Sequence, residues 1–196
     1  IKQSLRRGIL ERKITPVLCG SATRNFGSGP LLDFMKSFLP SPLERGELSG
    51  ILPESGEKIT RLPSTEEPFT ALVYKTLADP YVGRINYFRV YSGVLSPDSQ
   101  VYNVNKAKNE RIGQIFSMRG KNQISMEQVV AGDIAAVAKL QHTTTGDTLC
   151  DRSSPFQFPP IEFPEPVISF AVEPRTKGDE EKVSSGLSRF LEEDPT

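Results

Sequence analysis

The sequence has 196 residues, equal numbers of basic and acidic side chains (24 each) and 37% hydrophobic residues, which is enough for one or two domains and too apolar for a disordered chain. No apolar run is long enough to span a bilayer, so we expect no membrane segment. Two distant cysteines, Cys19 and Cys150, and one histidine, His142, argue against structural zinc, a disulfide framework and any site that needs several histidines. Because the sequence does not begin with Met and ends just after a helical pattern, we expect a piece of a longer, cytoplasmic protein.

Residues 1–44, with a net charge of +4, predict a helix, a strand and a second helix. The run from Ile14 to Cys19 is apolar and ends at Gly20, which is typical of a buried strand. Gly29 and Pro30 then open a helix whose apolar positions recur at helical spacing as far as Leu39. A strand followed by such a helix is half of a βα unit, so we expect the end of a larger α/β domain.

Residues 45–68, with a net charge of −2, are rich in Gly, Pro, Ser and charge, and predict an extended linker. Residues 69–152, with a net charge of +3, contain six or more short runs rich in β-branched and aromatic residues, separated by turn sequences such as Ser96-Pro97-Asp98-Ser99. This pattern predicts a mainly β fold, a small antiparallel β-barrel closed around one core.

The last 44 residues carry a net charge of −5. Residues 153–165 are a Pro-rich connector, and residues 166–196 read as the truncated βα start of an α+β domain. Within it, Val167 to Val172 predicts a strand, and Asp179 to Glu193 predicts a helix with one apolar face.

No residue is a catalytic candidate and no metal site is expected. Cys19 and Cys150 sit in strand patterns and read as core residues, whereas His142 lies in a turn-like segment, so a Cys/His nucleophile pair is not favoured. The adjacent acidic residues lie in linker or helix-surface contexts, where solvation explains them. There is no P-loop, and Asn105-Lys106-Ala107-Lys108 has a lysine where the guanine-reading N-K-x-D motif needs its aspartate.

One cluster of charge carries a binding hypothesis. Five cations lie within sixteen residues that hold one acid, Glu110; they are Lys106, Lys108, Arg111, Arg119 and Lys121. One interpretation is a hairpin that approaches a nucleic-acid backbone. The other is a solvated sheet edge that charge protects from aggregation.

Four segments, in order along the chain, resemble bacterial translation elongation factor G. The last strand, loop and helix of that family's G domain are resembled by VLCGSATRNFGSGPLLDFMKSFLPSP. Its second domain is resembled by two segments, ADPYVGRINYFRVYSGVL and AGDIAAVAKLQHTTTGDTLCD. The opening of its third domain is resembled by PEPVISFAVEPRTKGDEEKVSSGLSRFLEEDP. The resemblance implies a translation-factor barrel between the end of a G domain and the start of domain III.

The resemblance also implies the sites. Ser21 and Ala22, with Thr23 adjoining, match the family's fifth guanine-nucleotide motif, whose backbone contacts the base. The other nucleotide motifs are absent from this sequence, so we expect no cofactor on this piece, and GTP or GDP with Mg²⁺ on the whole protein. The implied partners are the ribosome, through small-subunit ribosomal RNA, and the protein's own G domain and later domains. In that setting the five cations become ribosomal RNA contacts.

The implied function is a share in GTP-dependent ribosomal translocation, in which this piece couples the G domain to the ribosome. Met118 to Ile124 departs most from the family, which leaves open a paralogue that acts in ribosome recycling or ribosomal protection. A free-standing RNA- or protein-binding barrel without GTPase activity is the remaining alternative.

Overall fold

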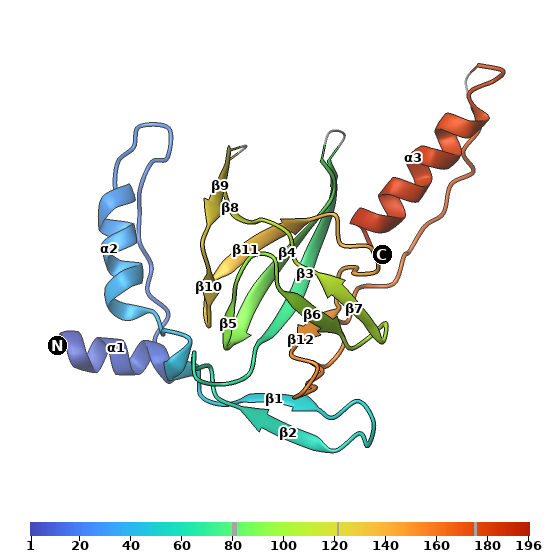
Figure 1. The fold of residues 1–196 in the computed structure, drawn as a ribbon. Helices are drawn as coiled ribbons and strands as arrows, with labels where there is room; N and C mark the ends of the chain where they lie inside the picture. Colours follow the sequence, from blue (N-terminus) through green and yellow to red (C-terminus); the bar gives the residue numbers. More distant parts are fainter. Residues whose placement is uncertain (80–81, 121, 175) are drawn as a thin grey trace. The chain divides into compact units, whose positions relative to one another are not determined.

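The structure is a computed structural model that describes residues 1–79, 82–120, 122–174 and 176–196. It divides into two compact units, residues 1–45 and residues 46–196 (Figure 1). Among the helices of these described residues, none combines the length and the apolar character that crossing a bilayer requires.

The first unit contains the two predicted helices but not the predicted strand. Helix α1 spans Lys2–Leu10, helix α2 spans Ser28–Phe38, and a short 3₁₀ turn, η1, follows at Leu43–Arg45. Residues 14–19 are extended but form no strand, and Val17 is 93% exposed. The expectation of a buried strand here was wrong, because a strand is buried only when neighbouring strands pair with it, and this unit supplies none among its described residues.

A two-stranded hairpin stands where the sequence predicted an extended linker. Strand β1 (Leu48–Ile51) pairs antiparallel with β2 (Lys58–Arg61). The sequence of this hairpin has little apolar periodicity, but the hairpin packs against a residue far along the chain: the ring of Phe156 lies so close to Gly50 that a Cβ there would come within 2.3 Å of it. Tertiary packing has therefore overridden a weak local signal.

Residues 69–152 form the predicted antiparallel β structure. The eight strands of the large sheet are β3 (Thr70–Asp79), β4 (Gly83–Ser92), β6 (Gln100–Asn103), β7 (Lys108–Arg111), β8 (Ile115–Arg119), β9 (Asn122–Met126), β11 (Ile134–Ala138) and β12 (Thr148–Cys150). Their order is β7-β6-β12-β3-β4-β11-β8-β9, and every neighbouring pair is antiparallel. Two shorter strands, β5 (Val94–Leu95) and β10 (Val129–Val130), pair with each other. The mainly β, antiparallel fold class is confirmed.

A single large hydrophobic cluster lies behind these strands. Phe88 and Val90 of β4, Val73 of β3 and Leu149 of β12 are fully buried in it, as is Ile112 between β7 and β8. The sheet therefore curls its two ends toward one core, as a small barrel requires.

The two parts of the C-terminal segment differ. Phe156 is fully buried, and Ile51 and Gln157 exchange two backbone hydrogen bonds of 2.9 and 3.0 Å. Farther along, residues 167–172 form no strand, so that prediction was wrong. No neighbouring strand pairs with them among the described residues, and Phe170 is 80% exposed.

The predicted terminal helix is present. Helix α3 spans Glu180–Glu193, and its C-terminal turn contacts the β3–β4 hairpin. Arg84 Nη2 lies 2.5 Å from Glu192 Oε1, and the backbone N–H of Ala78 donates to Glu193 Oε1 at 2.6 Å. Two adjacent glutamates that the sequence assigned to a solvated helix surface thus fix the helix end to the sheet.

Candidate nucleic-acid interface

The β6–β7 hairpin presents three of the five predicted cations, Lys106, Lys108 and Arg111, and all three are exposed. The turn is shaped by Asn103, whose Oδ1 accepts the backbone N–H of Lys106 at 3.0 Å. Two carboxylates lie near these cations: Lys106 Nζ lies 4.0 Å from Oδ1 of buried Asp147, and Arg111 Nη2 lies 3.7 Å from Oδ1 of exposed Asp98. Both separations exceed the length of a hydrogen bond, so the exposed charged groups of Lys106 and Arg111 can still meet an external anion.

One of the other two predicted cations, Arg119, belongs to a different part of the sheet. Arg119 ends β8, which lies next to the opposite edge strand in the order of the sheet, and is exposed there. Lys121 lies outside the described residues. The sequence cluster is thus divided between the β6–β7 hairpin and the β8–β9 hairpin, which only the curvature of the sheet brings together around a common cavity.

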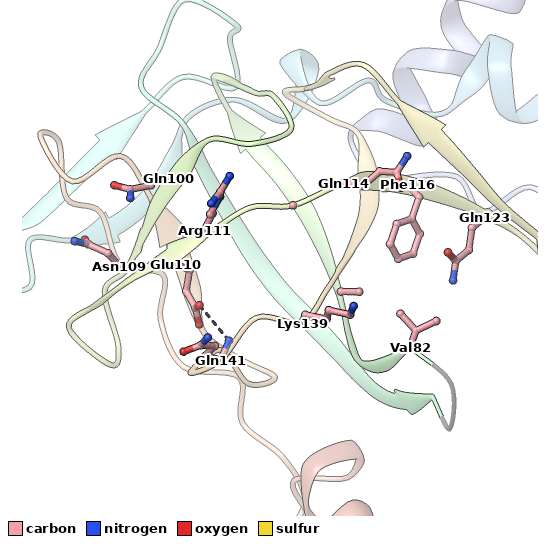
Figure 2. A pocket seen from close by; sticks show the side chains of 12 residues that line it. Val82, Gln100, Asn109, Glu110, Arg111, Gln114, Phe116, Gln123, Lys139 and Gln141 are labelled. Carbon is pink, nitrogen blue, oxygen red and sulfur yellow. Dashed lines mark hydrogen bonds between the residues drawn. The ribbon is translucent and has the colours of Figure 1, made fainter.

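That cavity opens between β7 on one side and β8 and β9 on the other (Figure 2). Its volume is about 600 Å³, and its lining consists mainly of amides and small or apolar groups with two cations and one acid: Val82, Gln100, Asn109, Glu110, Arg111, Gly113, Gln114, Phe116, Gln123, Ala138, Lys139 and Gln141. The cavity therefore adds a concave surface next to the exposed cations.

Glu110 is the residue of this region whose role the sequence analysis missed. It is 3% exposed, and its carboxylate accepts three hydrogen bonds, from the backbone N–H groups of Gln141 (3.1 Å) and His142 (2.7 Å) and from Thr143 Oγ1 (2.9 Å). Figure 2 shows its contact with Gln141. Charge-assisted bonds of this kind are strong, so Glu110 fastens the loop that follows β11 to strand β7.

A second set of buried hydrogen bonds fixes the same loop to β6. Asn103 Nδ2 donates to Thr143 Oγ1 at 3.1 Å and to Asp147 Oδ2 at 3.0 Å. Asp147 Oδ2 also accepts the backbone N–H of Thr144 at 2.8 Å. Because satisfied buried networks are rigid, the basic hairpin and the loop behind it are held in one arrangement before any partner arrives.

The predicted nucleotide contact, Ser21 to Thr23, lies in a tight loop of the first unit. Ser21 and Phe26 form an isolated β-bridge, so the N–H of Ser21 is already donated to the carbonyl of Phe26 at 2.9 Å. The backbone N–H groups of Ala22 and Thr23 have no acceptor among the described residues. A donor for a base carbonyl is therefore offered by Ala22 and Thr23 rather than by Ser21.

The cysteines and the histidine do not form a reactive pair. Cys150 is fully buried in β12, as predicted, and burial raises the pKa of its thiol. Cys19 is exposed, so the expectation that it is a core residue was wrong; the missing strand at residues 14–19 explains why. His142 is exposed in the loop that Glu110 holds.

Comparison with known proteins gives two family matches in order along the chain. Residues 68–152 match the model of "Elongation factor G domain 2", and residues 163–196 match that of "Elongation Factor G, domain III". Together these matches cover more than half of the chain.

A solved structure agrees with them. A crystal structure of a protein from Thermus thermophilus is similar over 99% of this chain, with 27% sequence identity and a TM-score of 0.78. The chain spans only 27% of the length of that protein.

Proposed function

Because the chain belongs to the elongation factor G family, we propose that it is the middle part of a translational GTPase that promotes GTP-dependent translocation on the ribosome. In this proposal residues 68–152 are the second domain, residues 163–196 begin the third, and residues 1–44 are the end of a G domain. The protein works in the cytoplasm, where its ribosomal partner is found. The consecutive matches to domains 2 and III of one family support this assignment.

The G domain of the whole protein would bind GTP or GDP with Mg²⁺. The contribution of this chain is small: backbone N–H groups of Ala22 and Thr23, adjoining Ser21, donate to the guanine carbonyl. Gly20 and Gly27 support such a role, since a Cβ on Gly20 would come within 2.8 Å of the Phe26 carbonyl and Gly27 has a φ of +83°. Glycine at these two positions therefore favours the tight loop that contains Ala22 and Thr23.

The sheet domain couples the G domain to the ribosome and contacts small-subunit ribosomal RNA. The observation that carries this part is the β6–β7 hairpin, on which Lys106, Lys108 and Arg111 are exposed while buried hydrogen bonds fix the backbone beneath them. Cations on a fixed backbone lose less entropy when they meet phosphates. Arg119, which is exposed at the end of β8, extends this proposed contact toward the β8–β9 hairpin. The proposal also includes Lys121, which lies outside the described residues.

The test is binding of the chain to purified small ribosomal subunits across a range of salt concentrations. A Lys106→Ala/Lys108→Ala double variant should bind more weakly, and its slope of log affinity against log salt should be shallower by about 1–2, because each lost phosphate contact contributes roughly 0.7–0.9. Lys58→Ala/Lys75→Ala removes the same charge from exposed positions away from the hairpin and is the matched control.

If the two double variants lose the same amount of affinity for the subunit, the loss comes from net charge alone and not from the hairpin. If both double variants bind the subunit as the native sequence does, the proposed ribosomal RNA contact is wrong, and a paralogue with a different docking surface is favoured.

A further inference from the structure

The cavity between β7 and the β8–β9 hairpin has walls of an unusual kind. Five of its twelve lining side chains are amides: Gln100, Asn109, Gln114, Gln123 and Gln141. In Figure 2 they surround the opening from both sides, with Gln100 and Asn109 on the β6–β7 side and Gln114 and Gln123 on the β8–β9 side. An amide offers a donor and an acceptor side by side, which is the pattern that reads the edge of a nucleobase.

The charged groups of the cavity lining that a ligand can reach are positive. Its one acid, Glu110, is 3% exposed and directs its carboxylate into three hydrogen bonds with the loop at residues 141–143. Its two cations, Arg111 and Lys139, are exposed at the opening. Asp98, which is exposed outside the cavity wall, lies 3.7 Å from Arg111 Nη2. An anionic group must therefore compete with Asp98 at Arg111, whereas no carboxylate among the described residues pairs with Lys139.

The backbone at Lys139 supports a functional reading of this cation. Lys139 has a φ of +66°, a conformation that side-chain-bearing residues seldom adopt, and its N–H donates to the carbonyl of Arg84 at 2.9 Å. Such a backbone conformation costs free energy and is found most often at active sites and ligand-binding sites. Here it places the lysine at the end of β11, on the rim of the cavity (Figure 2).

The floor of the cavity is apolar. Phe116 is 5% exposed, and Val82 and Ala138 pack against the small cluster to which it belongs. In Figure 2 the Phe116 ring lies between Gln114 and Gln123. Because this ring is buried, the partly exposed Val82 and Ala138 supply the accessible apolar surface of the floor. An apolar floor, amide walls and cations at the rim match the three parts of a nucleotide: the base plane, its polar edge and its phosphate.

We propose that this cavity binds one unstacked nucleotide of RNA, with the base over the apolar floor at Val82 and Ala138, its edge on the amides, and the phosphate on Lys139 and Arg111. The inference rests on the proposed RNA contact of the sheet domain and assigns it a specific subsite. Its volume, about 600 Å³, is within the range of small-molecule sites. RNA is commonly recognised through such splayed-out bases.

The probes are the four nucleoside 5′-monophosphates and inorganic phosphate, each titrated into the 196-residue chain while the side-chain amide signals are followed by NMR. At least one nucleotide should shift the signals of Gln114, Gln123 and Gln141. Inorganic phosphate should leave them in place. Absence of any nucleotide shift, or equal shifts with phosphate alone, would overturn the proposal.

Gly113 provides a steric variant, because a Cβ at this position would meet nothing within 4 Å and its side chain would occupy the cavity. Gly113→Leu should weaken nucleotide binding by about tenfold or more without changing charge. Gly186→Leu, also at a glycine with open space around it, is the matched control. If Gly113→Leu fails to fold, Gln123→Ala tests the same cavity by removing one of its amides and should also weaken nucleotide binding. Exposed Gln128→Ala is its control.

The double variant of Lys106 and Lys108 separates this inference from the proposed function, since neither lysine lines the cavity. It should leave mononucleotide binding unchanged. If cavity variants bind nucleotides normally while the lysine variant loses ribosome binding, the subsite is wrong and the interface stands. If nucleotide binding in the cavity is confirmed while the lysine variant binds the subunit normally, the proposed interface is wrong and the subsite stands.

Discussion

Two six-residue segments, both rich in β-branched and aromatic residues, have opposite environments in this molecule. Residues 85–90 (INYFRV) form the middle of β4, paired on both sides, and Phe88 is fully buried. Residues 167–172 (VISFAV) are at least as apolar, but they are extended without a partner among the described residues, and Phe170 is 80% exposed. The comparison teaches that β-branched and aromatic residues favour a strand only in the presence of neighbours that complete its hydrogen bonds.

The largest expected effect tests this contrast directly. Phe88→Ala should lower the free energy of unfolding by about 3–5 kcal/mol, since it leaves a cavity in the core of the sheet. Phe170→Ala should change it by less than about 0.5 kcal/mol. Urea denaturation followed by circular dichroism measures both. A comparable loss in the two variants would mean that residues 167–172 are packed in solution.

A smaller effect is expected where the Pro-rich connector is fastened to the sheet unit. The guanidinium of Arg61 donates to Thr70 Oγ1 and to Ser154 Oγ, the latter at 2.8 Å, and it lies 4.9 Å from the ring centroid of Phe156. Arg61→Ala should cost about 1–3 kcal/mol, because the buried hydroxyl of Thr70 loses its donor.

The same substitution at an exposed helix position, Arg189→Ala, is the control and should be nearly neutral. Hydrogen exchange should show increased opening of residues 153–158 in the Arg61 variant only. If those residues stay protected, their order comes from Phe156 alone.

The smallest effect concerns the two cysteines. In the folded chain a thiol reagent should modify exposed Cys19 quickly and Cys150 only on unfolding. Burial raises the pKa of Cys150 above its ordinary value of 9.0, so folding favours its neutral form. The contribution of the Cys150 thiol to the free energy of unfolding is complete below about pH 9. It is lost as the pH rises further, because the thiol ionises in the unfolded chain at a lower pH than in the folded chain.

Urea midpoints measured from about pH 7 to pH 10 should therefore fall more steeply for the native sequence than for Cys150→Ala. Identical slopes would show that Cys150 is solvated in the folded state.

Much of the fold could be predicted from local pattern. The strands of residues 69–152 were marked by turns such as Ser96-Pro97-Asp98-Ser99, and the three helices by apolar spacing. The strand predictions at residues 14–19 and 167–172 failed because pairing partners are not encoded locally. The hairpin at residues 48–61 was missed for the converse reason: Phe156, which packs against Gly50 of the hairpin, lies more than a hundred positions farther along the chain.

The site was less predictable than the fold. Charge density identified Lys106, Lys108 and Arg111 as candidates, and the structure exposes all three. Glu110 was noticed only as an isolated acid among cations, since its three hydrogen bonds reach a loop some thirty residues away. The cavity itself depends on how the sheet curls, which no local pattern records.

The bridge between Ile51 and Gln157 has a mechanical consequence. It joins the hairpin that precedes the large sheet to the segment that follows the sheet, through hydrogen bonds of 2.9 and 3.0 Å beside the stacked Arg61 and Phe156. A pull on the two flanking segments therefore acts first on this clasp, and the eight strands behind it stay unstretched until the clasp opens.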